Sequence, residues 1–566
     1  MKNKKLITKH CLNSIAIGLL VSSSGAMAAN YDALSQQQGG FSSLDPIAPL
    51  TTEQGSSSSA LESFQQAEQS NIKANYLEAL NLLKENKLEE AKNKISALLK
   101  KYPNEPEFYN LQALFESLKK DTTAAQQNYE KAIKLDGKNL LAHLGLAKLA
   151  LDGGQLDKAK EYANKALVIN DKSINAYLLL ADVAYQQKDN AEVEKLLLTA
   201  QEKVKGNITA EIEVIQNIGK IYATQKQPEK ILTISEDLVK RYPDNSMALS
   251  VLAGAQIVNN KKPAAEETLQ HIINLDKEDI NNRLLLAKLL SEHPDKDKEV
   301  LKLLNETIQI SPDQPEAQVF KTAYLIKLKR NEEAMELANK IDKQFPKLVL
   351  GKLLKGDVYL AEKKLDKATE MYQEAYKIQP NDKVLLTLAD LLNAQGKLPD
   401  AIKLLNNALE KNNKNGSIHF KLATTYQQQN DTQKAEEHYK AILTEQPDNV
   451  LALNNLAFLY SQNNNPQALD FAKKAYDNAP ESAAVLDTYG NILVKQGQAK
   501  EGLPILEKAA SLAPKENDIQ FHLAEAYSAN DNNQKALEIL EAIVKAEQDF
   551  SEKKAAVSLL DKLKKQ

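Results

Sequence analysis

The sequence predicts an all-α protein, a right-handed α-solenoid of about fourteen helix–turn–helix hairpins. Three observations predict this fold class. Small side chains recur about every 34 residues along most of the 566-residue chain, a second series of small residues runs in step with the first, and turn-forming residues fall between the expected helices. The composition agrees, because a chain with 43% hydrophobic residues but only 5% aromatic residues and no tryptophan favours helices over large β-rich domains.

The first series is the small residue of each second helix. Ala91, Ala125 and Ala159 show the usual step of 34 residues, whereas one step of 38 separates Val193 from Ile231. Small residues at such positions let the two helices of a hairpin cross closely. The fourteen members are Ala91, Ala125, Ala159, Val193, Ile231, Ala265, Val300, Ala334, Ala368, Ala401, Ala435, Ala468, Gly502 and Ala536.

The second series is the small residue of each first helix, and it tests the period independently. All of its fourteen members are Ala or Gly except Thr322, so the number of hairpins does not depend on one pattern alone. The members are Ala79, Ala113, Ala147, Ala181, Gly219, Ala253, Ala287, Thr322, Gly356, Ala389, Ala423, Ala457, Gly490 and Ala524.

Turn-forming residues mark where each element ends. An asparagine or glycine follows several first helices, where a left-handed residue ends a helix at little steric cost. Proline begins several second helices, where its missing N–H is not needed. The turn residues are Asn86, Gly154, Asn260, Gly396, Asn430 and Gly497, and the helix-starting prolines are Pro228, Pro263, Pro399 and Pro466.

This arrangement resembles the tetratricopeptide repeat (TPR) family, whose unit is a 34-residue helical hairpin with small and large apolar residues at fixed positions. The segment 417–447 shows it most clearly, with Leu422, Ala423 and Tyr426 followed by Ala435 and Tyr439. The sequences of 453–461, 485–497 and 502–509 further resemble the closing repeats of PrsT, a TPR family that accompanies exosortase and exopolysaccharide loci of Gram-negative bacteria. That resemblance implies a role in surface-polysaccharide or exported-protein assembly.

The N-terminus predicts export. Four lysines precede the apolar run 12–21, and Ala26-Met27-Ala28 is a small-residue cleavage site, so we expect a signal peptide over 1–28 that is cut after Ala28. The only cysteine, Cys11, lies inside it, which suits an oxidising compartment. We therefore expect the mature protein in the periplasm or associated with the cell envelope, with no transmembrane span after cleavage.

Beyond the signal we expect three parts. Residues 29–69 are polar and form a disordered leader, in which the apolar residues Phe41 and 44–50 indicate a spacer or, alternatively, a docking peptide. The solenoid should cover 70–548, with irregular places near 203–209 and 291–297. A capping helix should fill 549–566, with Ser551 as its N-cap and Val557 among its inward residues.

Several function classes find no support. Strong catalytic motifs are absent, and His143 and His419 occupy packing positions, so we expect no enzyme, no cofactor and no metal site. Removal of the four signal lysines takes the net charge from −4 to about −8, which argues against a nucleic-acid partner. A solenoid instead presents an extended inner face, lined by its first helices, to protein or extended peptide partners.

That inner face supplies the candidate binding residues. Their amide, carboxylate and aromatic groups are suited to a polypeptide backbone, whereas a lysine and arginine clamp for a C-terminal carboxylate is not evident. Polysaccharide is the alternative partner, with Tyr185, Phe420, Phe458 and Phe521 as stacking platforms. The candidates are Asn110, Asn175, Asp182, Tyr185, Lys220, Lys288, Asp357, Asp390, Phe420, Gln427, Asn454, Phe458, Asp487, Asn491, Phe521 and Glu525.

Overall fold

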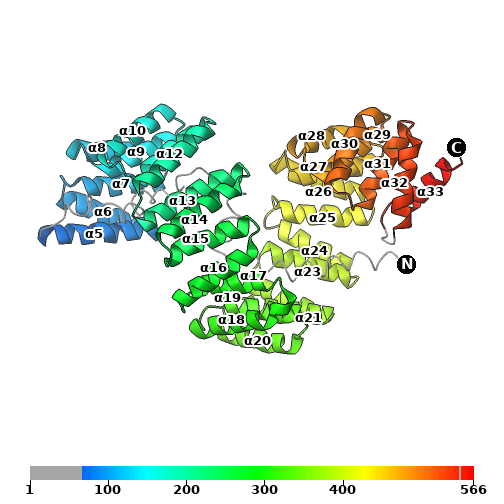
Figure 1. Cartoon of the computed structure of the whole chain (residues 1–566), viewed down its shortest axis with the longest axis horizontal. Coiled ribbons are helices and arrows are strands. Elements are labelled where there is room, and N and C mark those ends of the chain that lie inside the picture. The colour runs from blue at the N-terminus through cyan, green and yellow to red at the C-terminus, as the bar shows by residue number, and fades with distance from the viewer. Residues whose placement is uncertain (1–66, 547–549, 566) are drawn as a thin grey trace. The chain divides into compact units, whose positions relative to one another are not determined.

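The computed structural model describes residues 67–546 and 550–565, and all regular secondary structure within them is helical (Figure 1). The predicted signal peptide and nearly all of the predicted leader lie outside these residues. The predicted fold class is confirmed: fourteen helical hairpins follow one another between Ala67 and Lys545.

The first helices of the hairpins carry odd numbers. They are α5 (Ala67–Lys84), α7 (Pro106–Leu118), α9 (Leu140–Asp152), α11 (Ile174–Gln186), α13 (Ile208–Thr224), α15 (Ser246–Val258), α17 (Ile280–Leu290), α19 (Glu316–Lys327), α21 (Leu350–Ala361), α23 (Asp382–Ala394), α25 (Gly416–Gln428), α27 (Val450–Gln462), α29 (Ala483–Lys495) and α31 (Asn517–Ala529).

The second helices carry even numbers. They are α6 (Leu88–Lys101), α8 (Thr122–Leu135), α10 (Leu156–Ile169), α12 (Asn190–Lys203), α14 (Pro228–Arg241), α16 (Lys262–Leu275), α18 (Asp297–Ile310), α20 (Asn331–Gln344), α22 (Leu365–Ile378), α24 (Leu398–Leu409), α26 (Thr432–Glu445), α28 (Ala468–Asn478), α30 (Ala499–Leu512) and α32 (Asn533–Lys545).

Many of the helices begin at side-chain caps. The side-chain oxygen of Asn139 accepts a hydrogen bond from the backbone N–H of Ala142 at 2.9 Å, which satisfies a donor that has no partner inside the helix. Asn449 caps α27 in the same way at 3.0 Å from the N–H of Ala452. Equivalent caps are Asp121, Ser173, Asp189, Asn207, Asn245, Asp279, Asn381, Asn415, Asp431 and Asn532.

The turns inside the hairpins use left-handed residues, as the sequence predicts. Gly154 has φ of 69° and Asn430 has φ of 61°, and the other four predicted turn residues also have positive φ. The sequence analysis missed that lysine fills this position in other hairpins, although a side chain with a Cβ is strained there. These lysines are Lys120, Lys188, Lys226, Lys329 and Lys363.

The two series of small residues form the close contacts within each hairpin. Ala91, Ala113 and Ala423 are among many members that are fully buried. Glycine is required where the approach is closest: a Cβ at Gly490 of α29 would lie 2.6 Å from Cγ of Leu506 on α30. The predicted register therefore places small residues in the core, with larger residues filling the space around them.

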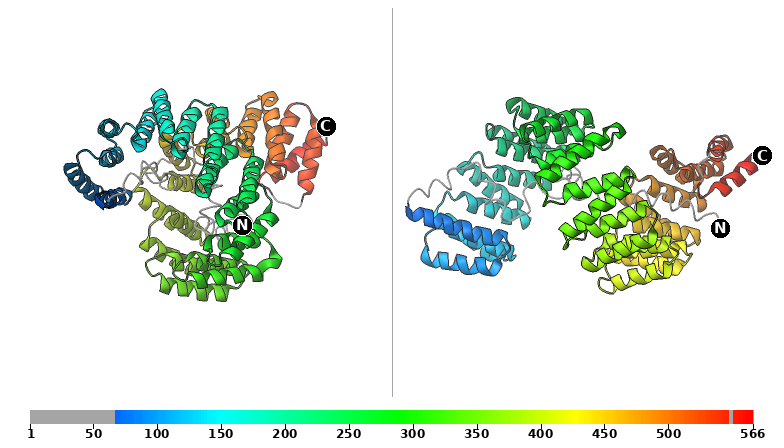
Figure 2. Two further views of the ribbon diagram at one scale, coloured as in Figure 1. Left: turned by 60° about the vertical axis from the view of Figure 1, so that its left-hand side comes forward. Right: turned by 90° about the horizontal axis from the view of Figure 1, so that it is seen from below.

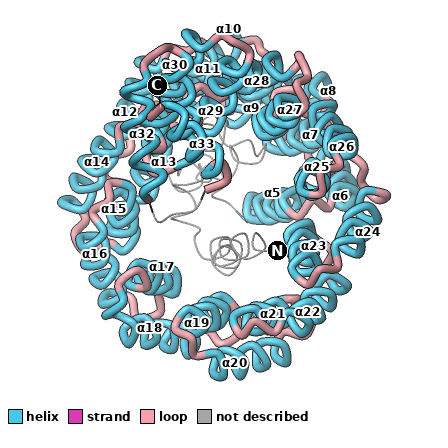
Figure 3. Tube along the Cα trace, turned by 90° about the vertical axis from the view of Figure 1, so that its right-hand side faces the viewer, coloured by secondary structure: helices cyan, strands magenta, loops and turns pink. Residues whose placement is uncertain are grey.

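The described residues belong to two compact units, one ending at Tyr324 and the other beginning at Leu325. Within each unit consecutive hairpins stack along the chain, as α8 does on α9 in the first unit and α28 on α29 in the second (Figure 2). In the first unit α15 and α17 lie inside α16 and α18, and in the second α21 and α23 lie inside α22 and α24 (Figure 3). First helices thus form one face of each unit, which we call its inner face.

The two expected irregular places have simple local structures. The step of 38 residues appears as an extra turn at the N-terminal end of α13, which has 17 residues where α11 has 13. The buried carboxylate of Glu211 secures this turn, accepting hydrogen bonds from the N–H of Gly206 and the hydroxyl of Tyr242, both at 2.8 Å, and pairing with Arg241. Near 291–297 the chain forms a short 3₁₀-helix, η2 (Pro294–Lys296).

The last helix, α33 (Lys553–Leu563), packs on α32 at the end of the second unit. Two details of the predicted cap are wrong. The hydroxyl of Ser551 does not cap the helix but donates to Asp518 of α31 at 2.7 Å. Val557 is 38% exposed because Ala556, the residue before it, takes the buried position.

Candidate functional site: the inner face of the first helices

The inner face of the second unit carries two pairs of polar side chains whose members bond to each other. Asp390 of α23 makes an ion pair with Lys421 of α25. Farther along, Oδ1 of Asp487 on α29 lies 2.7 Å from Nδ1 of His522 on α31. Burial lowers the pKa of His522, but the hydrogen bond to Asp487 and its charge outweigh burial and raise that pKa above its ordinary value. Each pair joins one first helix to the next.

Between these pairs lies α27, whose sequence contains no charged residue. Leu451 is 64% exposed and Phe458 is 39% exposed. They are seven residues apart, which places both on one side of the helix, and Asn454 lies between them on the same side. We call Leu451, Asn454 and Phe458 the α27 patch.

A hydrogen-bonded network supports this patch from beneath. The hydroxyl of Tyr439 on α26 donates to Oε1 of Gln427 at 2.9 Å, and Nδ2 of Asn455 donates to the same hydroxyl at 3.3 Å. The ring of Phe420 meets Tyr439 edge-on, with ring centroids 6.0 Å apart. The predicted residues Gln427 and Phe420 therefore fix α25 and α26 against α27.

Several predicted surface residues are buried instead, and for them the expectation is wrong. Phe521 is only 2% exposed, because it packs in the core formed by α30, α31 and α32, so it presents no face for stacking. Asn491 is 7% exposed. Asp357 is 5% exposed and accepts a hydrogen bond from Tyr372, and its burial raises its pKa to about 7.

In the first unit, too, several of the predicted inner-face residues are buried. Asn110 is fully buried and donates to the capping oxygen of Asn139 at 2.9 Å, so it ties one hairpin to the next. Asn175 and Asp182 are also buried. Desolvation lowers the pKa of Lys220, and the nearby charge of Asp182 opposes that change, so these two groups interact across α11 and α13.

The remaining predicted residues vary in exposure. Tyr185 is 43% exposed on α11. Lys288 and Glu525 are half-buried, and burial raises the pKa of Glu525. The residues that the prediction missed are Lys421, His522 and Leu451. Leu451 was detectable, because it precedes Phe458 by seven residues on a helix without charges.

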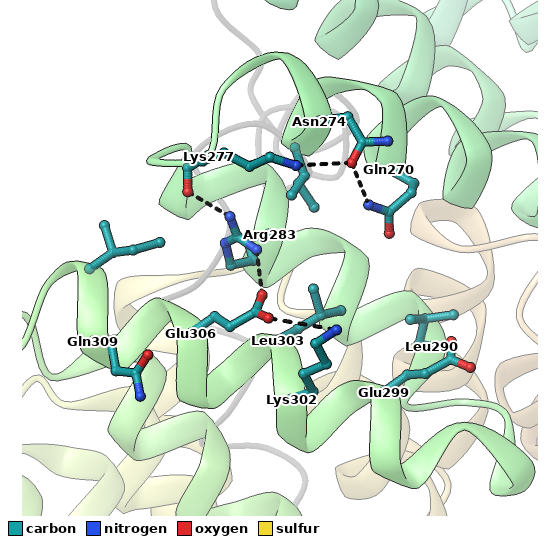
Figure 4. A pocket seen from close by; sticks show the side chains of 12 residues that line it. Gln270, Asn274, Lys277, Arg283, Leu290, Glu299, Lys302, Leu303, Glu306 and Gln309 are labelled. Atoms are coloured by element: carbon teal, nitrogen blue, oxygen red, sulfur yellow. Dashed lines mark hydrogen bonds and ion pairs between the residues drawn. The ribbon is translucent and has the colours of Figure 1, made fainter.

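A second kind of surface lies between consecutive second helices. A groove of about 660 Å³ runs between α16 and α18, with Arg283 of α17 in its floor (Figure 4). Arg283 donates to Oε2 of Glu306 at 2.8 Å and to the carbonyl of Lys277 at 2.6 Å. A similar groove lies between α22 and α24 in the second unit, and Leu303 and Leu404 line the two at equivalent positions.

The charged side chains in the first groove compensate one another. In the first, the cations Arg283 and Lys302 both face Glu306, the latter at 3.9 Å, so the charges largely compensate one another. Among residues 67–546 and 550–565 there is no group of three or more His, Cys, Asp or Glu side chains arranged to hold a metal ion. His143 is buried near Tyr162, and His419 contacts His438 with 2.9 Å between their Nδ1 atoms.

Comparison with known proteins agrees with this geometry. The tetratricopeptide repeat family matches residues 118–172, 359–424, 392–457 and 493–560. The matched segments are similar to tetratricopeptide repeats. Outside those ranges, the same period and the same helical hairpins extend from Ala67 to Lys545.

Parts of the chain are similar in sequence to several other proteins. The chain is 28% identical to the human protein O-mannosyl-transferase TMTC3 over 41% of its length, and 26% identical to human tetratricopeptide repeat protein 21A over 52%. It is 24% identical to the TPR repeat-containing protein PA4667 of Pseudomonas aeruginosa over 31%. These matches span only 25%, 22% and 30% of the respective relatives.

Two solved structures are similar to the chain at lower sequence identity. Cut9–Hcn1 of the APC/C matches at 16% identity over 81% of this chain and 96% of that chain, with a TM-score of 0.34. Yeast Tom70 matches at 16% identity over 82% and 96%, also with a TM-score of 0.34. In the described part of the protein, no helix combines the length and apolarity that crossing a membrane requires.

Proposed function

We propose that this protein is a non-enzymatic, exported TPR scaffold that binds extended polypeptide segments on the inner face of its second unit. The α27 patch carries the proposal. Leucine and phenylalanine side chains are exposed here on a helix without charges, and the charged side chains on the neighbouring helices pair with one another. An exposed apolar surface of this kind is typical of a site that binds a partner.

We further propose that its partners are envelope proteins of a Gram-negative bacterium, in exopolysaccharide or exosortase-linked assembly. The predicted signal peptide, the single cysteine within it and the resemblance of 453–509 to PrsT support this setting. Fractionation should find the protein in the periplasm or bound to the envelope, with an N-terminus at Ala29. A cytoplasmic protein that retains residues 1–28 would contradict the setting but not the binding surface.

Site-specific photocrosslinking in cells tests the binding surface. A photoreactive phenylalanine analogue in place of Phe458 should give discrete protein adducts. The same analogue in place of Val168, which is 88% exposed on α10, is the matched control and should not give them. Equal adducts from both positions, or none from position 458, would show that the α27 patch is not a partner surface.

The polysaccharide alternative loses one of its four expected platforms, because Phe521 is buried. Phe458 and Tyr185 keep exposed rings but lie in different units. Titration of the purified protein with the organism's exopolysaccharide distinguishes the two partner classes. Binding that disappears on Phe458→Ala would favour the glycan, whereas no binding leaves the polypeptide partner.

A further inference from the structure

Two histidines from different helices meet in the hairpin formed by α25 and α26. His419 lies on α25 and His438 on α26, and their Nδ1 atoms are 2.9 Å apart. The ring centroids are 5.1 Å apart, with 47° between the ring planes. The expectation that His419 is a packing residue considers one histidine alone, whereas the folded hairpin brings two together across 19 residues of sequence.

A backbone hydrogen bond decides which nitrogen of His419 is able to bind a cation. Its Nε2 lies 2.8 Å from the carbonyl oxygen of Asn413, and a carbonyl oxygen only accepts, so Nε2 carries the proton. In the neutral ring Nδ1 then has a free lone pair, and His438 donates the hydrogen bond between the two Nδ1 atoms. Metal-binding histidines typically donate their other N–H to a carbonyl in this way, which fixes the tautomer and the direction of the ring.

Stacking holds the second histidine in place. The ring of His438 lies parallel to that of Tyr426, with 6° between the ring planes and 5.6 Å between the centroids. His419 and His438 are both half-buried, so their rings are oriented by contacts and remain accessible from solvent. Ligands that are already oriented lose little side-chain freedom when they bind an ion.

The separation of the two nitrogens fits a transition-metal ion. An ion that binds both nitrogens at about 2.0–2.1 Å and at a right angle holds them about 2.8–3.0 Å apart, whereas a tetrahedral angle holds them about 3.3–3.4 Å apart. The observed 2.9 Å therefore corresponds to neighbouring positions of a square or octahedral ion. Cu²⁺ and Ni²⁺ prefer tetragonal geometry with nitrogen and oxygen ligands. Rotation about χ2, which is soft in histidine, turns both lone pairs toward such an ion.

We infer that His419 and His438 form a binding site for a divalent transition-metal ion, with Cu²⁺ as the preferred ion. Cu²⁺ binds a given set of nitrogen ligands most tightly among the divalent first-row metals. The ion takes one Nδ1 from each helix, and the proton that His438 carries on Nδ1 moves to its Nε2. Since the described residues contain no group of three or more His, Cys, Asp or Glu side chains arranged around a metal, water fills the other positions of the ion. The inference does not depend on the proposed function.

Titration of the purified full chain with copper(II) chloride tests the site, with the ion itself as the probe. Calorimetry counts the bound ions, and electron paramagnetic resonance counts the nitrogens that bind each Cu²⁺. We expect the native protein to bind one ion more than the double variant His419→Gln with His438→Gln, and to show two nitrogen ligands for that ion. Either substitution alone should weaken binding by more than the about tenfold to hundredfold that loss of an outer-shell hydrogen bond costs. Because the ion joins α25 to α26, copper should slow hydrogen exchange in these helices of the native protein only.

His271→Gln combined with His293→Gln is the matched control. The side chains of these histidines are 44% and 45% exposed, and each lies beside a carboxylate, at 3.2 Å from Asp244 and 3.1 Å from Glu266. This variant should keep the copper signal with two nitrogens, and circular dichroism should show the same helix content in all variants. Retention of the additional ion by the double variant, or a signal from one nitrogen in the native protein, would overturn the inference. Photocrosslinking at Phe458 uses no copper, so it tests the proposed function separately.

Discussion

Tyr372 on α22 donates a hydrogen bond to the buried carboxylate of Asp357 on α21, within one hairpin. Burial raises the pKa of Asp357 to about 7, from an ordinary value of 3.8. The folded protein therefore holds this proton more tightly than the unfolded chain does. Its contribution to stability is full below pH 4 and is lost as the pH rises through 7.

Asp357→Asn should remove this pH dependence, because asparagine stays neutral and keeps an oxygen for Tyr372. We expect it to stabilise α21 and α22 by about 2 kcal/mol more at pH 8 than at pH 5. Hydrogen exchange of peptides from these helices, corrected for intrinsic rates, measures this. Asp390→Asn is the matched control: it occupies the equivalent position on α23 but is half-buried beside Lys421, and it should give no such gain.

Gly490→Ala tests whether the small residues set the distance between helices. The added Cβ would lie 2.6 Å from Cγ of Leu506 and 3.3 Å from the carbonyl of Gly502, so the hairpin must open. Overpacking of this kind costs about 1–3 kcal/mol, measured by urea denaturation. Gly416→Ala is the control, because no atom lies within 4 Å of its new Cβ, and it should not destabilise the protein.

The substitution Lys363→Gly should increase the stability of the folded protein. Its backbone is left-handed, with φ of 61°, and its side chain is exposed. Glycine removes the steric strain but adds freedom to the unfolded chain, so we expect a net gain of about 0.5–1 kcal/mol. The reciprocal change Gly396→Ala, at φ of 77°, should cost about 1 kcal/mol. A loss of stability in Lys363→Gly would show that its side chain contributes more than its strain costs.

Glu211→Ala should weaken the junction of α13 and α14. The substitution leaves the N–H of Gly206 and the hydroxyl of Tyr242 without their acceptor, and it removes one of the two carboxylates that pair with Arg241. We expect a loss of about 2–4 kcal/mol and faster hydrogen exchange at the start of α13. Glu236→Ala, at an exposed position on α14, is the control and should change little.

The fold could be predicted from the sequence because each repeat carries the same residue types at the same positions. The small side chains of Ala91 and Gly490 indicate which positions of the repeat are buried between the helices. Gly154 indicates a turn, because glycine adopts positive φ without strain. Lys363 occupies the same kind of turn without any such signal, since the surrounding hairpin imposes its strained backbone.

The binding face was harder to predict, because exposure depends on how closely neighbouring first helices pack. Asp357 and Asp390 occupy equivalent positions, yet one is buried against Tyr372 and the other pairs with Lys421 at the surface. Phe458 and Phe521 likewise look alike in the sequence but differ in exposure, at 39% and 2%. The position of a residue in the repeat therefore indicates whether it can lie on the inner face. Whether it is exposed there depends on how adjacent hairpins pack.

Leu451→Ser combined with Phe458→Ser should weaken the capture of any partner that crosslinks at position 458. Both side chains are exposed, so their loss should leave stability nearly unchanged, whereas a central apolar contact contributes about 1–3 kcal/mol to binding, or about fivefold to 140-fold in Kd. Titration of the purified partner measures this. Val168→Ser combined with Val557→Ser removes exposed apolar side chains of α10 and α33 and should leave Kd unchanged. Equal weakening by both pairs would mean that the partner recognises general surface hydrophobicity and not the α27 patch.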